Sequence, residues 1–106
     1  MPQVALLSRV RVREGRGGEL VAAFGPVFAA AEREPGTLVY ALNRSNDDPD
    51  LFWVCELYAD DAAFAAHRDS DAMAAATPAL GELIAEAEVT VGAPVSARSL
   101  PASDVS

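Results

Sequence analysis

The sequence predicts a small α+β domain with the element order β-α-β-β-α-β and a four-stranded antiparallel sheet. Three observations support this fold class. Strand-like stretches, which alternate in polarity or are continuously apolar, occur at 3–13, 37–44, 51–58 and 89–95. Helix-like stretches, with apolar residues three and four positions apart, separate the first strand from the second and the third from the fourth. A length of 106 residues suffices for one domain only.

The first two predicted elements are a strand over 3–13 and a helix from Glu19 to about Glu32. In the strand, apolar residues occupy even positions and three arginines occupy odd ones, so one face of the strand is more polar and more exposed to solvent. The helix has a single apolar stripe, formed by Leu20, Ala23, Phe24, Val27, Phe28 and Ala31. Gly25-Pro26 interrupts this helix. Because proline lacks an N–H group and clashes with the preceding turn, we expect a kink or a break there.

Two strands follow the first helix. Pro35-Gly36 ends that helix, and the strands cover Thr37–Arg44 and Leu51–Tyr58. The six residues between them, 45–50, are turn formers without an apolar side chain, so they predict a surface hairpin loop.

The last third of the chain predicts short helices and a final strand. Asp60 can cap a helix that extends to His67, and Ser70 can cap a further segment. Thr77-Pro78 supplies a cap and a first-turn proline for a last helix that ends near Ala87. The inward stripe of these helices consists of Met73, Leu80, Leu83 and Ile84. A fourth strand then runs from Val89 to about Val95, which completes the ferredoxin-like order. We expect residues 1–97 to form one domain and residues 98–106 to be a flexible tail.

Charge and composition exclude several functions. The chain has 16 acidic and 8 basic residues, a net charge of −8, and all its basic residues are arginines. The negative charge argues against nucleic acid and anionic membrane partners, and the absence of lysine excludes Schiff-base chemistry on a lysine and a phosphate-loop lysine. The single cysteine cannot form an internal disulfide. Since the N-terminus lacks signal-peptide features, we expect a cytoplasmic protein.

One face of the predicted sheet is expected to bind a second copy of the chain. Helices cover only one face of such a sheet, and the other face would carry Trp53, Cys55 and Leu57. Burial against an identical face is the simplest way to remove this apolar area from water. We therefore predict a homodimer joined sheet to sheet.

A series of short motifs lies between residues 34 and 70. They are Glu34-Pro35-Gly36, Tyr40, Asp47-Asp48-Pro49, Phe52 with Glu56 and Tyr58, the helix Asp61–His67, and Ser70. In this order they resemble the antibiotic biosynthesis monooxygenase domain family, and the resemblance covers roughly residues 3 to 95. It implies a dimeric α+β barrel with a ligand cleft between the sheet and the helices. It also implies oxygenation of small aromatic or quinol-like molecules without metal, haem or flavin.

His67 is the first candidate catalytic residue, because it is the only histidine and histidine ordinarily titrates near neutral pH. It follows Ala63 and Phe64 by four and three residues, so it shares the inward face of its helix. Its role is either direct chemistry or that of a partly buried histidine bonded to the backbone.

Glu56 is the second candidate, since it shares the strand parity of Phe52, Val54 and Tyr58. A buried carboxylate must be paired or protonated. Its partner is either His67, which it would orient, or an arginine such as Arg9 or Arg44.

An oxygenase without a cofactor requires a substrate that can itself donate an electron to oxygen, as a deprotonated phenol or hydroquinone can. We expect His67 to take the proton and Glu56 to stabilise the imidazolium. Hydrogen bonds to a substrate oxygen are expected from Tyr58, Tyr40 or Asn43. We expect the apolar lining of the site to consist of Phe24, Phe28, Phe52, Val54 and Phe64. The alternative is that these side chains only pack in the core.

Subfamily signatures and metal motifs limit the chemistry further. Anthrone oxygenases that resemble this chain carry asparagine and tryptophan where it has Val54 and Tyr58. Haem-degrading members carry tryptophan and histidine where it has His67 and Thr77, so no second histidine is present to ligate iron. One histidine and one cysteine cannot form a zinc site, and we expect neither metal nor cofactor. The alternatives are a non-catalytic dimeric ligand-binding or stress-response module and a non-oxidative isomerase or cyclase.

Overall fold

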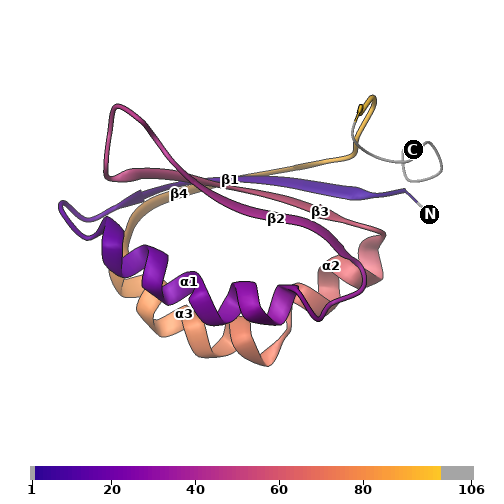
Figure 1. Cartoon of the computed structure of the whole chain (residues 1–106), viewed down its shortest axis with the longest axis horizontal. Coiled ribbons are helices and arrows are strands. Elements are labelled where there is room, and N and C mark those ends of the chain that lie inside the picture. The colour runs from indigo at the N-terminus through magenta and orange to yellow at the C-terminus, as the bar shows by residue number, and fades with distance from the viewer. Residues whose placement is uncertain (1, 99–106) are drawn as a thin grey trace.

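The computed structural model describes residues 2–98, which form four strands and three helices. The elements, in chain order, are β1 (Val4–Val12), α1 (Gly17–Ala31), β2 (Thr37–Arg44), β3 (Leu51–Tyr58), α2 (Asp61–Arg68), α3 (Asp71–Leu83) and β4 (Ile84–Gly92). The strands form one antiparallel sheet in the order β2-β3-β1-β4, and the helices lie on one face of it (Figure 1). The predicted ferredoxin-like α+β fold is confirmed. Of the predicted tail, residues 99–106 lie outside the described residues.

The core lies between the sheet and the two long helices. Phe52 and Val54 of β3 pack there against Leu20 and Val27 of α1, and each of these side chains is at most 3% exposed. Full burial of one such side chain stabilises the fold by roughly 1.5–3 kcal/mol. Alternate residues of β3 therefore point toward the helices, which places Glu56 and Tyr58 on the helical side of the sheet as well.

Helix α1 runs through Pro26 without a break, contrary to the expected interruption (Figure 1). Proline removes one hydrogen bond, the one that would reach the carbonyl group of Ala22. Both residues are exposed, so water can bond to that carbonyl group. Pro26 thus lies on the side of the helix where its missing donor costs least.

Helix α3 also contains a proline, and the predicted start of a helix at Thr77-Pro78 is wrong. The helix begins earlier, because the Ser70 hydroxyl accepts a hydrogen bond from the Met73 N–H group at 3.3 Å. The Thr77 hydroxyl does not cap a helix and instead donates to the Met73 carbonyl group at 2.8 Å. Pro78 is exposed and lies within the continuous helix.

Strand β4 begins at Ile84, five residues before the predicted start, and ends at Gly92. Its pairing with β1 places Glu86 opposite Arg11 and Glu88 opposite Arg9. Opposite charges at facing positions of an antiparallel pair favour this register. The segment with alternating glutamates therefore belongs to the sheet and not to the preceding helix.

The face of the sheet opposite the helices carries an apolar patch, which we call the outer patch. It consists of Ala5, Leu7, Val39, Ala41, Trp53, Cys55 and Leu57, which lie in adjoining cross-strand rows. Leu7 is 48% exposed and Val39 is 40% exposed. The predicted interface residues Trp53, Cys55 and Leu57 thus share one face of β3.

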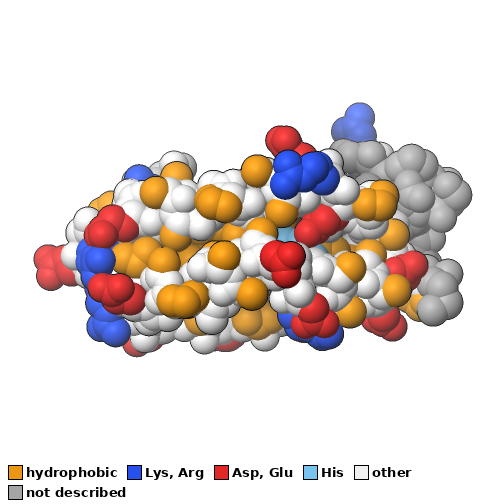
Figure 2. All heavy atoms as spheres, turned by 90° about the horizontal axis from the view of Figure 1, so that it is seen from below, with side chains coloured by type: hydrophobic (Ala, Val, Ile, Leu, Met, Phe, Trp, Pro, Cys, Tyr) orange, Lys and Arg blue, Asp and Glu red, His pale blue; other side chains and the backbone are white. Residues whose placement is uncertain are grey.

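The helical side has a different surface. Acidic side chains are spread over it among hydrophobic ones, and arginines form no extended patch on this face (Figure 2). No helix within residues 2–98 is both long and apolar enough to cross a membrane.

Candidate functional site

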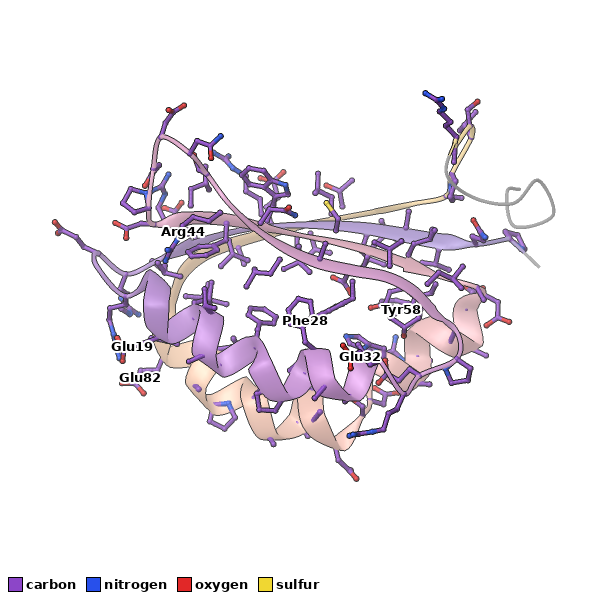
Figure 3. All side chains as sticks on the ribbon, viewed as in Figure 1. Glu19, Phe28, Glu32, Arg44, Tyr58 and Glu82 are labelled. Carbon is purple, nitrogen blue, oxygen red and sulfur yellow. The ribbon has the colours of Figure 1, made fainter. Side chains whose placement is uncertain are left out.

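Polar and aromatic side chains from four segments meet between the sheet and α2. His67 comes from α2, Tyr40 from β2, and Glu56 and Tyr58 from β3, while Glu34 comes from the loop after α1. The ring of His67 lies 4.7 Å from that of Tyr40 and 5.5 Å from that of Tyr58, measured between centroids. Tyr58 projects from the sheet into the layer between sheet and helices, as Phe28 does from α1 (Figure 3).

His67 is buried, with 3% of its surface exposed. Its Nδ1 atom lies 2.8 Å from the Glu34 Oε1 atom. Its Nε2 atom is buried and has no hydrogen-bond partner in the part of the chain that the structure describes. A buried polar atom without a partner costs roughly 1–3 kcal/mol, so such an atom calls for a functional explanation.

Glu56 and Tyr58 form a second polar pair beside His67. The Tyr58 hydroxyl donates a hydrogen bond to Glu56 Oε1. Burial raises the pKa of Glu56, and the hydrogen bond from Tyr58 and the charge of His67 oppose that rise. Burial and the neighbouring carboxylates raise the pKa of Tyr58 and that of Tyr40 above the ordinary tyrosine range. Both phenols therefore remain protonated at neutral pH and can donate hydrogen bonds.

The ring nitrogen of His67 is paired with Glu34, where the sequence had suggested Glu56 or a backbone group. Glu56 accepts a hydrogen bond from Tyr58, and the charge of His67 acts to lower the pKa of Glu56. Of the two arginines considered for Glu56, Arg9 lies on the outer face and Arg44 stacks over the Phe52 ring at 4.7 Å. No local pattern indicated Glu34, because 33 positions of sequence separate it from His67.

The expected aromatic lining divides into two groups. Phe28 and Phe64 border the site, since their rings lie 5.0 Å from Tyr40 and 5.3 Å from Tyr58 respectively. Phe24 contacts Phe28, with 6.4 Å between ring centroids, and belongs to the core cluster.

The remaining expected lining residues lie farther from His67. Val54 is a core residue, and so is Phe52, which is four residues from Glu56 along β3, a distance of about 13 Å in a strand. Asn43 lies on the outer face of the sheet, where its side-chain amide donates to the Trp53 carbonyl group at 3.2 Å. The structure therefore does not bring Asn43 together with His67.

The position of α2 depends on a glycine. Gly36 precedes β2, and a side chain at this position would meet the Cβ atom of Ala63 in α2. The N-terminus of α2 is held by the predicted cap, because Asp60 Oδ1 accepts a hydrogen bond from the Ala63 N–H group at 2.8 Å. The close approach at Gly36 thus lets α2 lie where His67 can reach Glu34.

The arrangement can perform acid–base chemistry. It combines an imidazole whose Nε2 atom has no partner in the described residues with two carboxyl groups and two phenols, all buried or half-buried. Within residues 2–98, no group of three or more His, Cys, Asp or Glu side chains is placed to hold a metal ion.

Fold and site together define an α+β fold with an acid–base cluster between its sheet and its helices. The family model for antibiotic biosynthesis monooxygenases matches residues 4–79 of the chain. The chain therefore belongs to the antibiotic biosynthesis monooxygenase family.

Solved structures support the same assignment. A Caulobacter crescentus protein, described as a candidate antibiotic biosynthesis monooxygenase, is 28% identical with a TM-score of 0.83, over 90% of this chain and 92% of its own. The protein Rv0793 of Mycobacterium tuberculosis is 28% identical with a TM-score of 0.82, over 92% of this chain and 99% of its own. SO0527 of Shewanella oneidensis is 28% identical with a TM-score of 0.81, over 87% and 90% of the two chains. The search of curated proteins finds no significant match.

Proposed function

We propose that this protein is a cofactor-independent monooxygenase that oxidises a small aromatic or quinol-like molecule with molecular oxygen. Family membership and the description of the Caulobacter crescentus protein support a monooxygenase-like role. The observation that carries the proposal is the buried Nε2 atom of His67, which has no partner in the described residues and belongs to a ring in contact with two tyrosine rings. Such a nitrogen is available to accept a proton from a bound substrate.

The reaction then begins with proton transfer from a phenolic hydroxyl of the substrate to His67 Nε2. The resulting anion donates one electron to O2, and the two radicals combine to form a carbon–oxygen bond. For an anthrone-type substrate, which reacts as its hydroxy tautomer, the peroxide anion takes the proton back from His67, and the hydroperoxide then loses water to leave a ketone. One oxygen atom stays on the carbon, and the other departs as water with the remaining hydrogen of that carbon and the proton returned by His67. The oxidation of the substrate by O2 therefore needs no external reductant.

Neighbouring side chains support this sequence. Proton transfer makes His67 an imidazolium, whose charge is stabilised by Glu34 in contact and by the nearby Glu56. The protonated hydroxyl of Tyr40 is available to donate a hydrogen bond to a substrate oxygen, whereas the Tyr58 hydroxyl already donates to Glu56. Phe28 and Phe64 supply apolar walls that exclude water from the charged intermediate.

Oxygen consumption tests the proposal. The purified protein is mixed with an anthrone or a hydroquinone in an oxygen electrode, and the product is analysed by mass spectrometry under ¹⁸O₂. We expect substrate-dependent oxygen uptake and one labelled oxygen atom in the product, without added metal, flavin or reductant. Turnover that continues under argon would instead identify an isomerase or cyclase. Ligand binding without turnover of any substrate would identify a binding module.

We further propose that the active species is a homodimer joined through the outer patch, with Trp53, Cys55 and Leu57 in the interface. The exposed apolar side chains of this face support the proposal, because a second copy would remove them from water. Light scattering on the purified protein is expected to give twice the chain mass of 11.1 kDa. A mass equal to one chain at micromolar concentration would contradict it.

A further inference from the structure

We propose that Glu34 is a positioning residue, which holds the proton of His67 on Nδ1 and thereby makes Nε2 the nitrogen that reacts. The effect on turnover rests on the proposed function, whereas the effect on the histidine tautomer does not. Glu34 was not among the residues expected to act in the site. Its assignment follows from three structural observations.

The first observation is that the Glu34 carboxylate is itself held in place. Its Oε1 atom lies 2.8 Å from His67 Nδ1 and also accepts a hydrogen bond of 2.8 Å from the Thr37 hydroxyl. The backbone on both sides is anchored, because the Glu34 N–H group donates to Ala31 and the Glu34 carbonyl group accepts from Thr37, each at 3.1 Å. A carboxylate oxygen in this position is an acceptor, so Nδ1 must be the donor.

The second observation concerns the alternative carboxyl group. Glu56 Oε1 accepts the hydrogen bond of the Tyr58 hydroxyl, and Nε2 of His67 has no partner in the described residues. Glu56 therefore does not hold the proton position of the imidazole. The two carboxyl groups therefore have different partners, since Glu34 contacts Nδ1 of His67 and Glu56 accepts the hydrogen bond of Tyr58.

The third observation is that the ring is confined. The rings of Tyr40 and Tyr58 both contact the His67 ring, with centroids 4.7 and 5.5 Å away, and the His67 side chain is 4% exposed. A 180° rotation of the ring about the Cβ–Cγ bond would place the Cδ2 carbon against Glu34 and remove the hydrogen bond to Oε1. Hydrogen bonding to one nitrogen of a histidine is the usual means by which a protein selects the tautomer.

The chemical consequence is that the imidazole of His67 has the tautomer needed for a general base before the substrate binds. With the proton on Nδ1, Nε2 carries a lone pair that no described residue engages. When Nε2 accepts a proton, Glu34 already contacts the resulting cation and stabilises it. Without Glu34, the ring would lose both the tautomer selection and this stabilisation.

Nuclear magnetic resonance tests the inference directly, because the chain has a single histidine and so a single set of imidazole nitrogen signals. The variants are Glu34→Ala and Glu34→Gln, and the matched control is Glu32→Ala, an exposed glutamate two positions earlier. In the unmodified protein at a pH where the ring is neutral, we expect the proton on Nδ1. In Glu34→Ala we expect a shift toward the Nε2–H form, with the control unchanged. A proton on Nε2 in the unmodified protein, or the same tautomer in all variants, would overturn the inference.

Kinetics supply the second measurement. With a substrate that the enzyme turns over, Glu34→Ala is expected to lower kcat by between about 10-fold and 10⁴-fold with little change in KM, as loss of an orienting carboxylate does elsewhere. Thermal unfolding identifies a variant that fails to fold, and Glu34→Gln then carries the test, because its side chain keeps the size of glutamate without the charge. If no oxygenase activity exists, the proposed function fails while the tautomer result still decides the role of Glu34. A Glu34 variant with unchanged kcat in an active enzyme would contradict the positioning role.

Discussion

Replacement of His67 by alanine is expected to lower the rate of oxygen uptake by about 10²- to 10⁴-fold, the range that a positioned general base contributes. The variant loses the one nitrogen in the buried layer that is free to take a substrate proton. Glu34 cannot replace it, because its Oε1 atom lies on the far side of the ring, at Nδ1. The measurement is the initial rate in an oxygen electrode with the substrate that the unmodified protein oxidises.

Two comparisons separate this effect from damage to the fold. Glu32→Ala alters an exposed residue outside the site, so its rate should remain within about twofold of the unmodified protein because surface changes have small effects. Added imidazole should restore part of the activity of His67→Ala, since the alanine leaves room for a small base. A folded His67→Ala protein with an unchanged rate would show that another group takes the proton.

Replacement of Gly36 by alanine is expected to destabilise the protein by about 1–3 kcal/mol, the usual cost of overpacking. The new methyl group would overlap the Cβ atom of Ala63, which is anchored close to the backbone of α2 and cannot rotate away. Helix α2 must then move outward, and His67 moves with it, away from Glu34. Thermal unfolding should show a lower Tm, by about 4–8 °C per kcal/mol for a domain of this size.

The matched control is Gly81→Ala, because a methyl group at Gly81 meets no atom within 4 Å. Gly81 lies within α3, so alanine should stabilise the helix by roughly 0.5–1 kcal/mol, an effect of opposite sign. Combining Gly36→Ala with Ala63→Gly removes the overlap and should recover part of the lost stability. Equal Tm values for Gly36→Ala and the unmodified protein would show that α2 adjusts without cost.

Some elements could be predicted because their signals are local. Strands β2 and β3 have the predicted bounds, since turn formers flank both and the apolar pattern covers only the paired residues. The inward orientation of His67 was predictable for the same reason, because its spacing from Phe64 lies within one helical turn. The prolines misled because the cost of a proline depends on which side of the helix faces water, and the sequence pattern around Pro26 does not show this.

The partner of His67 could not be predicted, because it depends on the path of a loop. Glu34 and Glu56 are both carboxylates near a turn or strand end, and strand parity indicates only Glu56. The choice between them depends on how the turn at Gly36 brings α2 against β2, and on the competing bond from Tyr58 to Glu56. Both are contacts between segments, which single-sequence patterns do not encode.

The strand order has a consequence for the synthesis of the protein. Strand β1 is made first but lies inside the sheet, and one of its two neighbours is β4, the last strand to be made. The β2–β3 hairpin can form early because its contacts are local, whereas one edge of β1 stays unpaired until Ile84–Gly92 has left the ribosome. An unpaired edge is the kind of surface on which nascent chains aggregate. The vulnerable period of this sheet therefore lasts from the synthesis of β1 until β4 is available to pair with it.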